Sequence, residues 1–142
     1  MFNIPLTIGV EEEYQIIDPE TRALSAYVQQ MMDDDSKIAL GDQLKPEFMQ
    51  SQIEVGSHIC RNVQEARAEL VRLRKQVDKI AQHHDRCIIA ASTHPFSKWQ
   101  EQKISEGERY RDLESHMQEV ARRMLIFGMH VHVGFGTEPE QL

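Results

Sequence analysis

Carboxylates and imidazoles recur at alternate positions in separate short segments of the sequence. Glu11 and Glu13 lie in a run rich in β-branched and aromatic residues, and His130 and His132 alternate with apolar residues. Because successive side chains of a strand point to opposite faces, each pair would project from one face. Carboxylates that lie close together repel one another unless a cation neutralises them. These residue types therefore favour binding of a hard divalent cation, Mg²⁺ or Mn²⁺.

A third segment carries Glu54, which shares a face with Gln52 if both lie on a strand. Glu47 lies seven residues earlier, and this odd offset places it on the other face unless a bulge or bend intervenes. If the three segments are neighbouring strands of one sheet, a cation-binding surface forms. Its members would be Glu11, Glu13, Glu54 and His130.

Each of these patterns also has an ordinary structural interpretation. Two alternating glutamates on a strand most often form a solvated face. Two alternating histidines on an apolar strand are a stronger indication of a ligand pair, since adjacent imidazoles rarely serve packing alone. Charged residues along residues 67–79 are most simply the solvent face of an amphipathic helix.

Four strands are predicted to position these side chains. The alternating or apolar patterns cover residues 7–17, 45–55, 87–91 and 129–135. On the last strand, Met129, Val131 and Val133 would supply a packed face opposite the histidines.

Helices are predicted between the strands. A helical period follows Asn62, whose capping partner would be Glu65, and another follows Ser105, with Glu108 as partner. Residues 21–40 are ambiguous, and a single helix is one interpretation. The alternation of strands and helices indicates a mixed chain of α and β elements.

Composition limits the class of protein. The 142 residues correspond to about one domain, and 40% hydrophobic and 27% charged residues are ordinary for a folded soluble chain. No apolar run approaches the roughly 18 residues of a membrane span. A formal net charge of -7 opposes nucleic-acid binding. Cys60 and Cys87 suit neither a disulfide framework nor a zinc site, and no secretory signal is evident, so a cytoplasmic location is expected.

The last residues have the pattern of a helix start. Thr137, a proline in the first turn and Glu140 resemble a capping sequence, yet the sequence stops at Leu142. The expectation is a chain that is cut off where an element begins.

Five motifs together resemble the type 2 glutamate-cysteine ligase family, which includes the YbdK-like carboxylate-amine ligases. The motifs follow the family's order over nearly the whole chain, and none alone is as specific as the set. They are Gly9-Val-Glu-Glu-Glu-Tyr, Lys45-Pro-Glu-Phe-Met-Gln-Ser-Gln-Ile-Glu, Thr93-His-Pro-Phe, Glu108-Arg-Tyr and Gly128-Met-His-Val-His-Val-Gly.

The resemblance implies an α+β fold: a mainly antiparallel curved sheet with helices on its outer face. Residues 1–142 would form a single partial catalytic domain of the glutamine-synthetase-like kind. ATP would phosphorylate an amino-acid carboxylate to an acyl phosphate, which an amine then attacks. Family metal ligands correspond to Glu11, Glu13, Glu47, Glu54 and His130, and substrate-side neighbours to Thr93 and His132. ATP and Mg²⁺, or Mn²⁺, are the implied cofactors, and no glycine-rich phosphate loop is present.

Length separates this chain from the family it resembles. Family members continue well past the histidine strand and contribute further strands and ligands, so this sequence matches only their amino-terminal portion. The leading hypothesis is an ATP-dependent ligase whose site another copy of the chain or a complementing chain completes. The alternative is a non-catalytic fragment or subunit that acts as an interaction partner. A metal-dependent hydrolase built on the two histidines is a third, less favoured interpretation, because it would need mostly histidine ligands.

Overall fold

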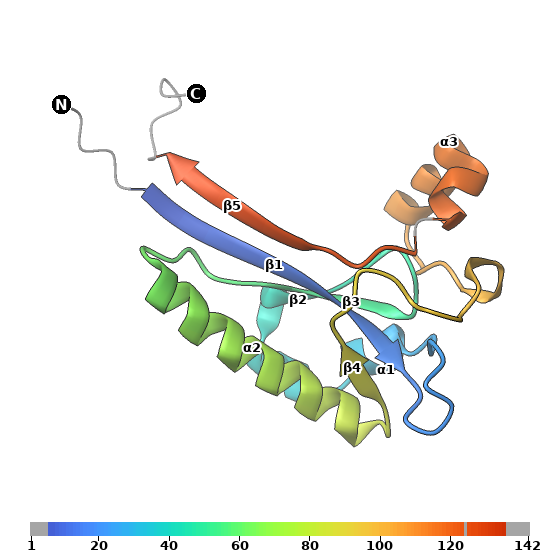
Figure 1. Ribbon diagram of the computed structural model, residues 1–142, viewed down its shortest axis with the longest axis horizontal. Coiled ribbons are helices and arrows are strands. Elements are labelled where there is room, and N and C mark those ends of the chain that lie inside the picture. Colours follow the sequence, from blue (N-terminus) through green and yellow to red (C-terminus); the bar gives the residue numbers. More distant parts are fainter. Residues whose placement is uncertain (1–5, 124, 136–142) are drawn as a thin grey trace.

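A computed structural model describes residues 6–123 and 125–135 and shows one antiparallel sheet (Figure 1). Its strands are β1 (Leu6–Ile17), β2 (Leu44–Pro46), β3 (Gln52–Gly56), β4 (Cys87–Ile89) and β5 (Met129–Phe135). The long strand β1 is central: β3 pairs with one edge and β2 adds beyond β3, while β4 and β5 pair with successive parts of the other edge. The predicted curved, mainly antiparallel sheet is thereby confirmed.

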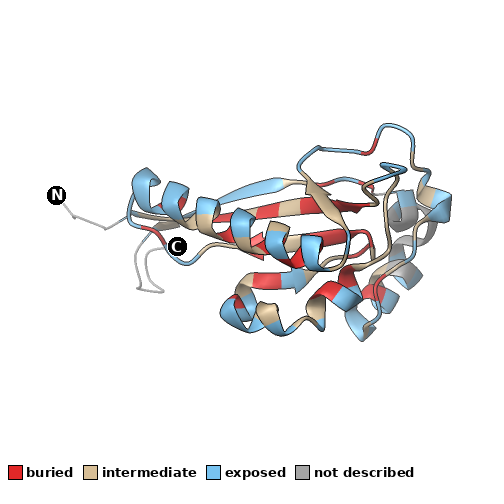
Figure 2. Cartoon of the chain, turned by 90° about the horizontal axis from the view of Figure 1, so that it is seen from below, coloured by how far each residue is buried: buried red, intermediate tan, exposed pale blue. Residues whose placement is uncertain are grey.

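The helices are α1 (Val28–Met32), α2 (Val63–His83) and α3 (Glu108–Arg123). Three short 3₁₀ turns cover Asp35–Ala39, Gly41–Gln43 and Trp99–Glu101. The capping box that starts α2 is present: the Asn62 side chain accepts a hydrogen bond from the Glu65 amide at 2.8 Å, and the Glu65 carboxylate accepts one from the Arg61 amide. Helix α2 lies along the sheet beneath β1 and β4 (Figures 1 and 2).

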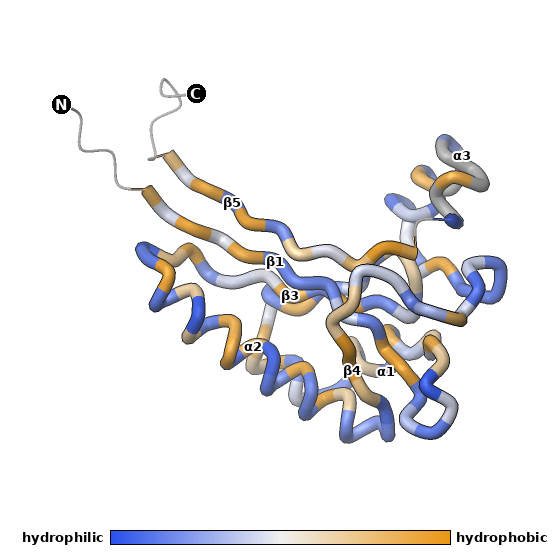
Figure 3. The backbone as a smooth tube through the Cα atoms, in the orientation of Figure 1, coloured by the Kyte–Doolittle hydropathy of each residue, from blue (hydrophilic) through white to orange (hydrophobic). Residues whose placement is uncertain are grey.

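The main core lies between α2 and one face of the sheet, here called the back face. Helix α2 is amphipathic, with apolar and polar stretches alternating along it (Figure 3). Its buried residues pack on alternate residues of β1 and β3, together with α1. The fully buried members include Ile16, Ile53, Leu73, Val77 and Ile80. Burial of this face leaves the other face of β1, β2, β3 and β5, the open face, available for polar side chains.

The predicted strand over residues 45–55 was wrong. It is two short strands, β2 and β3, which pair with each other through a turn closed by a 3.0 Å hydrogen bond from the Gln52 amide to the Met49 carbonyl. Residues 21–40 are also not one helix, since they contain only α1 and a 3₁₀ turn. The Ser105 hydroxyl does not cap α3; it donates to the Glu47 carbonyl, and α3 begins at Glu108.

Strand β5 covers the predicted residues, but its apolar side is not packed as expected. Met129, Val131, Val133 and Phe135 are 49% to 62% exposed. Between this side and the first turns of α2 lies an apolar groove that also contains Val63. The reason is positional: within the described residues, α2 packs along β1 and leaves the apolar side of β5 largely bare (Figure 1).

Two further expectations concern the ends and the membrane. The predicted helix start at Thr137 lies outside the described residues. Among the helices that the structure describes, none combines the length and apolarity that crossing a bilayer requires.

Candidate functional site

Strand register brings most of the predicted polar residues together on the open face. Glu13 pairs with Glu54 across β1 and β3, and Lys45 of β2 pairs with Glu54 on its other side. On the opposite edge of β1, Glu11 pairs with His130. Because paired residues point to the same face, these side chains form one patch across four strands.

Glu47 joins this patch although it lies on no strand. It occupies the first position of the turn between β2 and β3, so the alternation of a continuous strand does not apply to it. It lines a cavity of about 260 Å³ with Glu13 and His130. The odd offset between Glu47 and Glu54 required a bend, and this turn provides it. We call Glu11, Glu13, Glu47 and Glu54 the acidic cluster.

Burial and the like charges of the acidic cluster both act on Glu54. Its side chain is 15% exposed, and burial raises its pKa above the usual range, reinforced by the charges of Glu11, Glu47 and Glu13. The Lys45 ammonium, 3.7 Å from the Glu54 carboxylate, opposes this rise. A site that raises the pKa of a carboxyl by like charge is one that a bound cation would relieve.

The other carboxylates have hydrogen-bond donors within the chain. The Glu13 carboxylate accepts a hydrogen bond from the Gln52 side-chain amide at 2.8 Å and another from the Gly128 backbone amide at 2.7 Å. Glu11 lies 2.9 Å from Nε2 of His132 and 3.5 Å from Nδ1 of His130. The hydrogen bond with His132 holds the pKa of Glu11 below its usual value. Both predicted histidines therefore contact the same carboxylate.

The donor set is suited to a hard cation, since it consists mainly of carboxylate oxygens with two adjacent imidazoles. Within the described residues, however, no three acidic, histidine or cysteine side chains already surround a common point. The carboxylates instead hold the internal donors just described. A divalent ion at this face would therefore compete with them, and with Lys45, for these carboxylates.

A larger cavity of about 640 Å³ adjoins the cluster at the Glu11 end. It is bounded by the 3₁₀ segment before β2, by the end of β3 and by β1, and Glu11, Lys45, His58 and His132 line it. Its walls carry both acids and bases, so it suits a small polar ligand. Lys45 is the residue of this region that the sequence interpretation missed; recognising the turn at residues 49–51 would have placed it opposite Glu54.

Thr93 stands apart from the cluster. It is exposed in the loop after β4, and the contacts described for this part of the chain do not join it to the acidic residues. Its neighbour His94 is buried and structural: Nε2 lies 3.0 Å from the Arg22 carbonyl, and Nδ1 accepts from the Ser97 amide. The loop approaches the site through two carbonyls: that of Ala91 accepts from the Gln15 side chain at 3.0 Å, and that of Ser92 accepts from the Phe127 amide at 3.0 Å.

An ion pair between the buried Glu12 and the half-exposed Arg74 lies behind the cluster. Glu12, between Glu11 and Glu13, points to the back face and is 5% exposed. Burial acts to raise its pKa, but hydrogen bonds from Arg74 of α2 and the Tyr14 hydroxyl outweigh burial and lower it. This pair anchors α2 to the segment of β1 that carries the two site glutamates. The Arg74 guanidinium is thus not simply part of a solvent face.

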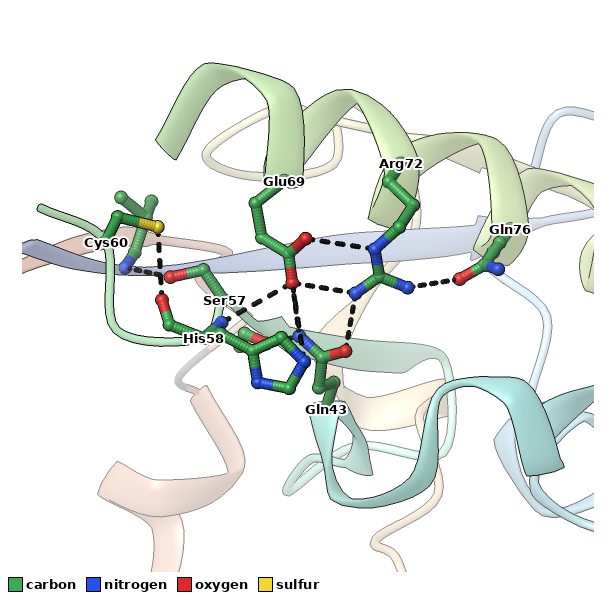
Figure 4. Close-up of polar contacts among 9 residues, drawn as sticks. Gln43, Ser57, His58, Cys60, Glu69, Arg72 and Gln76 are labelled. Atoms are coloured by element: carbon green, nitrogen blue, oxygen red, sulfur yellow. Dashed lines mark hydrogen bonds and ion pairs between the residues drawn. The ribbon is translucent and has the colours of Figure 1, made fainter. Parts of the chain in front are cut away.

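A second polar network fastens the β2–β3 hairpin to α2 (Figure 4). Gln43, just before β2, donates to the Glu69 carboxylate at 2.7 Å and to the Gly56 carbonyl at 3.0 Å. Arg72 donates to Glu69 and to Gln43. These bonds close one wall of the 640 Å³ cavity and fix the two strands that carry Lys45 and Glu54.

Substituting Glu69 with glutamine is expected to lower the free energy of unfolding by about 1–2 kcal/mol at pH 7, because hydrogen bonds to a charged group are lost. Hydrogen bonds from Arg72, opposed by burial and aided by Gln43, lower the pKa of Glu69 to about 2. The stability that ionised Glu69 contributes is therefore present above the usual carboxyl pKa of 4.5, and it is lost as the pH falls toward 2. Urea unfolding at several pH values measures this; the exposed Glu106→Gln variant serves as control, and a pH-independent deficit would contradict the assignment.

Almost the whole of this chain resembles parts of known proteins. The model for the family described as glutamate-cysteine ligase family 2 matches residues 7–141. Proteins provisionally named glutamate–cysteine ligase 2 are 55% identical in Herpetosiphon aurantiacus and 52% identical in Roseiflexus sp., each over 93% of this chain. The crystal structure of a Francisella tularensis glutamate–cysteine ligase in complex with AMP superposes with a TM-score of 0.72 at 15% identity, covering 94% of this chain and 28% of its own. The chain spans about a third of the length of the two relatives, 34% and 35%.

Proposed function

The chain belongs to glutamate-cysteine ligase family 2, and from this premise we propose that it forms the amino-terminal part of an ATP-dependent carboxylate-amine ligase. The reaction would transfer the terminal phosphoryl group of ATP to an amino-acid carboxylate, typically the side-chain carboxylate of glutamate. The amine of a second amino acid, such as cysteine, then attacks the acyl phosphate, forms the amide bond and releases inorganic phosphate. Fold similarity to a ligase solved with AMP supports the nucleotide requirement.

The observation that carries this proposal is the acidic cluster on the open face. Phosphoryl transfer depends mainly on positioning and charge neutralisation, and the protein supplies no nucleophile of its own. We assign Glu11, Glu13, Glu47, Glu54 and His130 to Mg²⁺ or Mn²⁺ binding, which would neutralise the nucleotide phosphates. His132 would orient Glu11 through their hydrogen bond.

Substrate binding is assigned with different support at two positions. His132 lines the 640 Å³ cavity beside Glu11, which suits contact with a small polar substrate. Thr93 is proposed for the same role only through the family motif, because it is exposed on a loop away from this cavity. Small amino acids and ATP are thus the expected partners, together with a second copy or a complementing chain that supplies the rest of the site.

A cytoplasmic location is proposed with this function. Cys60 and Cys87 are free thiols, and reduced cysteines are the rule in a reducing compartment.

The test is ADP release with Mg²⁺ and ATP, measured with and without glutamate plus cysteine. The chain is assayed alone and mixed with a complementing fragment, defined as the part of the Herpetosiphon relative beyond the region that this chain matches. Turnover that requires both amino acids supports the ligase. Hydrolysis of an amide substrate with metal ion but without ATP, measured in a separate assay, would indicate the metal-dependent hydrolase. Absence of ADP release in both preparations would favour the non-catalytic alternative.

A further inference from the structure

Lys45 occupies an unusual place in the acidic cluster. It is the basic residue of the row in which Lys45, Glu54 and Glu13 lie side by side across β2, β3 and β1. Its ammonium is 3.7 Å from the carboxylate of Glu54, whose side chain is 15% exposed. A cation site built of carboxylates therefore has a protein cation already in contact with one of its proposed ligands.

The backbone holds Lys45 in this position rather than leaving it to a flexible loop. Register between β2 and β3 sets it directly opposite Glu54. The Gln43 side chain fixes the start of β2 through its bonds to Gly56 and Glu69 (Figure 4). Contact between the two charges thus follows from the strand pairing.

The lysine side chain nevertheless has room to leave. It is 53% exposed and borders the 640 Å³ cavity at the Glu11 end of the cluster. A four-carbon stem can turn its ammonium into that cavity without any change in the backbone. Displacement by a stronger cation therefore needs no unfolding of the hairpin.

We infer that Lys45 is a resident counter-ion of Glu54 that competes with a divalent cation for this carboxylate, so that this lysine lowers the cation affinity of the acidic cluster. The inference rests on the proposed function, because it concerns the same carboxylates. It goes beyond that function in giving Lys45 a role: it keeps the carboxylates compatible with the fold before the cation binds and sets the concentration at which the cation enters. The displaced ammonium then faces the adjoining cavity, where an anionic substrate group could meet it.

The experiment measures Mn²⁺ binding to the full chain by the electron paramagnetic resonance signal of free Mn²⁺ at constant pH and ionic strength. Lys45→Met removes the charge but keeps the length of the stem, and it is expected to tighten Mn²⁺ binding about tenfold, since a unit charge this close to a ligand opposes the ion. Lys45→Arg keeps the charge and should stay within about twofold of the unsubstituted chain. Lys75→Met, on the exposed side of α2, is the matched control for loss of one positive charge.

Two results would overturn the inference. Equal affinities for Lys45→Met and Lys75→Met would mean that only net charge matters, and weaker binding by Lys45→Met would mean that the lysine supports the site. Failure of every variant to bind Mn²⁺ would also overturn it, because removing Lys45 should open the cluster. Thermal unfolding is expected to change little, since a half-exposed ion pair contributes little to stability. The ligase proposal is decided separately by ADP release, so either can fail alone.

Discussion

Replacing Glu54 with glutamine is expected to reduce amino-acid-dependent ADP release by roughly 100- to 1,000-fold in whichever preparation is active. Glutamine keeps the shape of the side chain but removes the negative charge of Glu54, whose side chain is 15% exposed. A catalytic metal ion contributes several kcal/mol to transition-state stabilisation, and about 1.4 kcal/mol corresponds to a factor of ten. Steady-state ADP release at saturating ATP measures the loss.

Protein stability distinguishes this result from simple unfolding. Burial and the like charges around Glu54 raise its pKa, so its ionised form destabilises the fold at pH values above that raised pKa. The Glu54→Gln variant should therefore melt at the same temperature as the unsubstituted chain or higher while losing activity. Glu20→Gln, on the exposed turn after β1, controls for the loss of one charge. A Glu54→Gln variant with activity within fivefold of the unsubstituted chain would remove Glu54 from the proposed site.

Replacing Arg74 with methionine is expected to lower the free energy of unfolding by about 1–2 kcal/mol at pH 7, because the buried Glu12 carboxylate loses its charged hydrogen-bond donor. The change leaves the buried Glu12 carboxylate with only the Tyr14 hydroxyl as a described side-chain partner. Although the Arg74 side chain is 54% exposed, its removal is costly because the Glu12 charge stays desolvated. Urea unfolding at equilibrium measures the difference.

The pH dependence of this loss has a definite sign. With Arg74 present, the pKa of Glu12 is lowered. Ionised Glu12 therefore stabilises the fold above the ordinary carboxyl pKa, and this stabilisation is lost as the pH falls through the lowered pKa. Without Arg74, the raising effect of burial on that pKa is less opposed, so the variant loses less stability than the unsubstituted chain as the pH falls. The deficit should therefore shrink with acidification, and a constant deficit would contradict this account.

A double substitution supplies the control for Arg74. In Glu12→Gln with Arg74→Met, the buried group is neutral and the desolvated charge is absent. This variant should be more stable at pH 7 than Arg74→Met alone. Equal stabilities would mean that Arg74 acts through packing of its stem rather than through its charge.

Sequence patterns predicted the elements whose period is long and regular. Strand β5 has the predicted bounds, the Asn62 cap starts α2 as expected, and Glu11 and Glu13 lie on the face opposite Glu12. These features depend on local alternation and capping, which neighbouring residues determine. The family motifs added the antiparallel topology, which no single strand pattern specifies.

The remaining errors concern tertiary contacts. The hairpin within residues 45–55 was missed because its apolar residues do not mark the turn, and that turn explains how Glu47 reaches the cluster. Arg74 looked like an ordinary solvent-facing residue because α2 is amphipathic, yet its partner lies 62 positions earlier in the chain. The exposed side of β5 was predicted to be packed because alternation shows which residues are apolar but not whether anything covers them.

The position of β5 in the sheet has a consequence for the order of folding. Glu11 and His132 are 121 positions apart in the sequence, whereas β2 and β3 form a local hairpin. Closing so long a loop costs conformational entropy that a hairpin does not pay, and chains dominated by distant pairings fold slowly. During synthesis, β1 and β3 can pair before the histidine strand has left the ribosome. The acidic half of the patch therefore assembles first, and the imidazoles reach it only when the last described strand docks on β1.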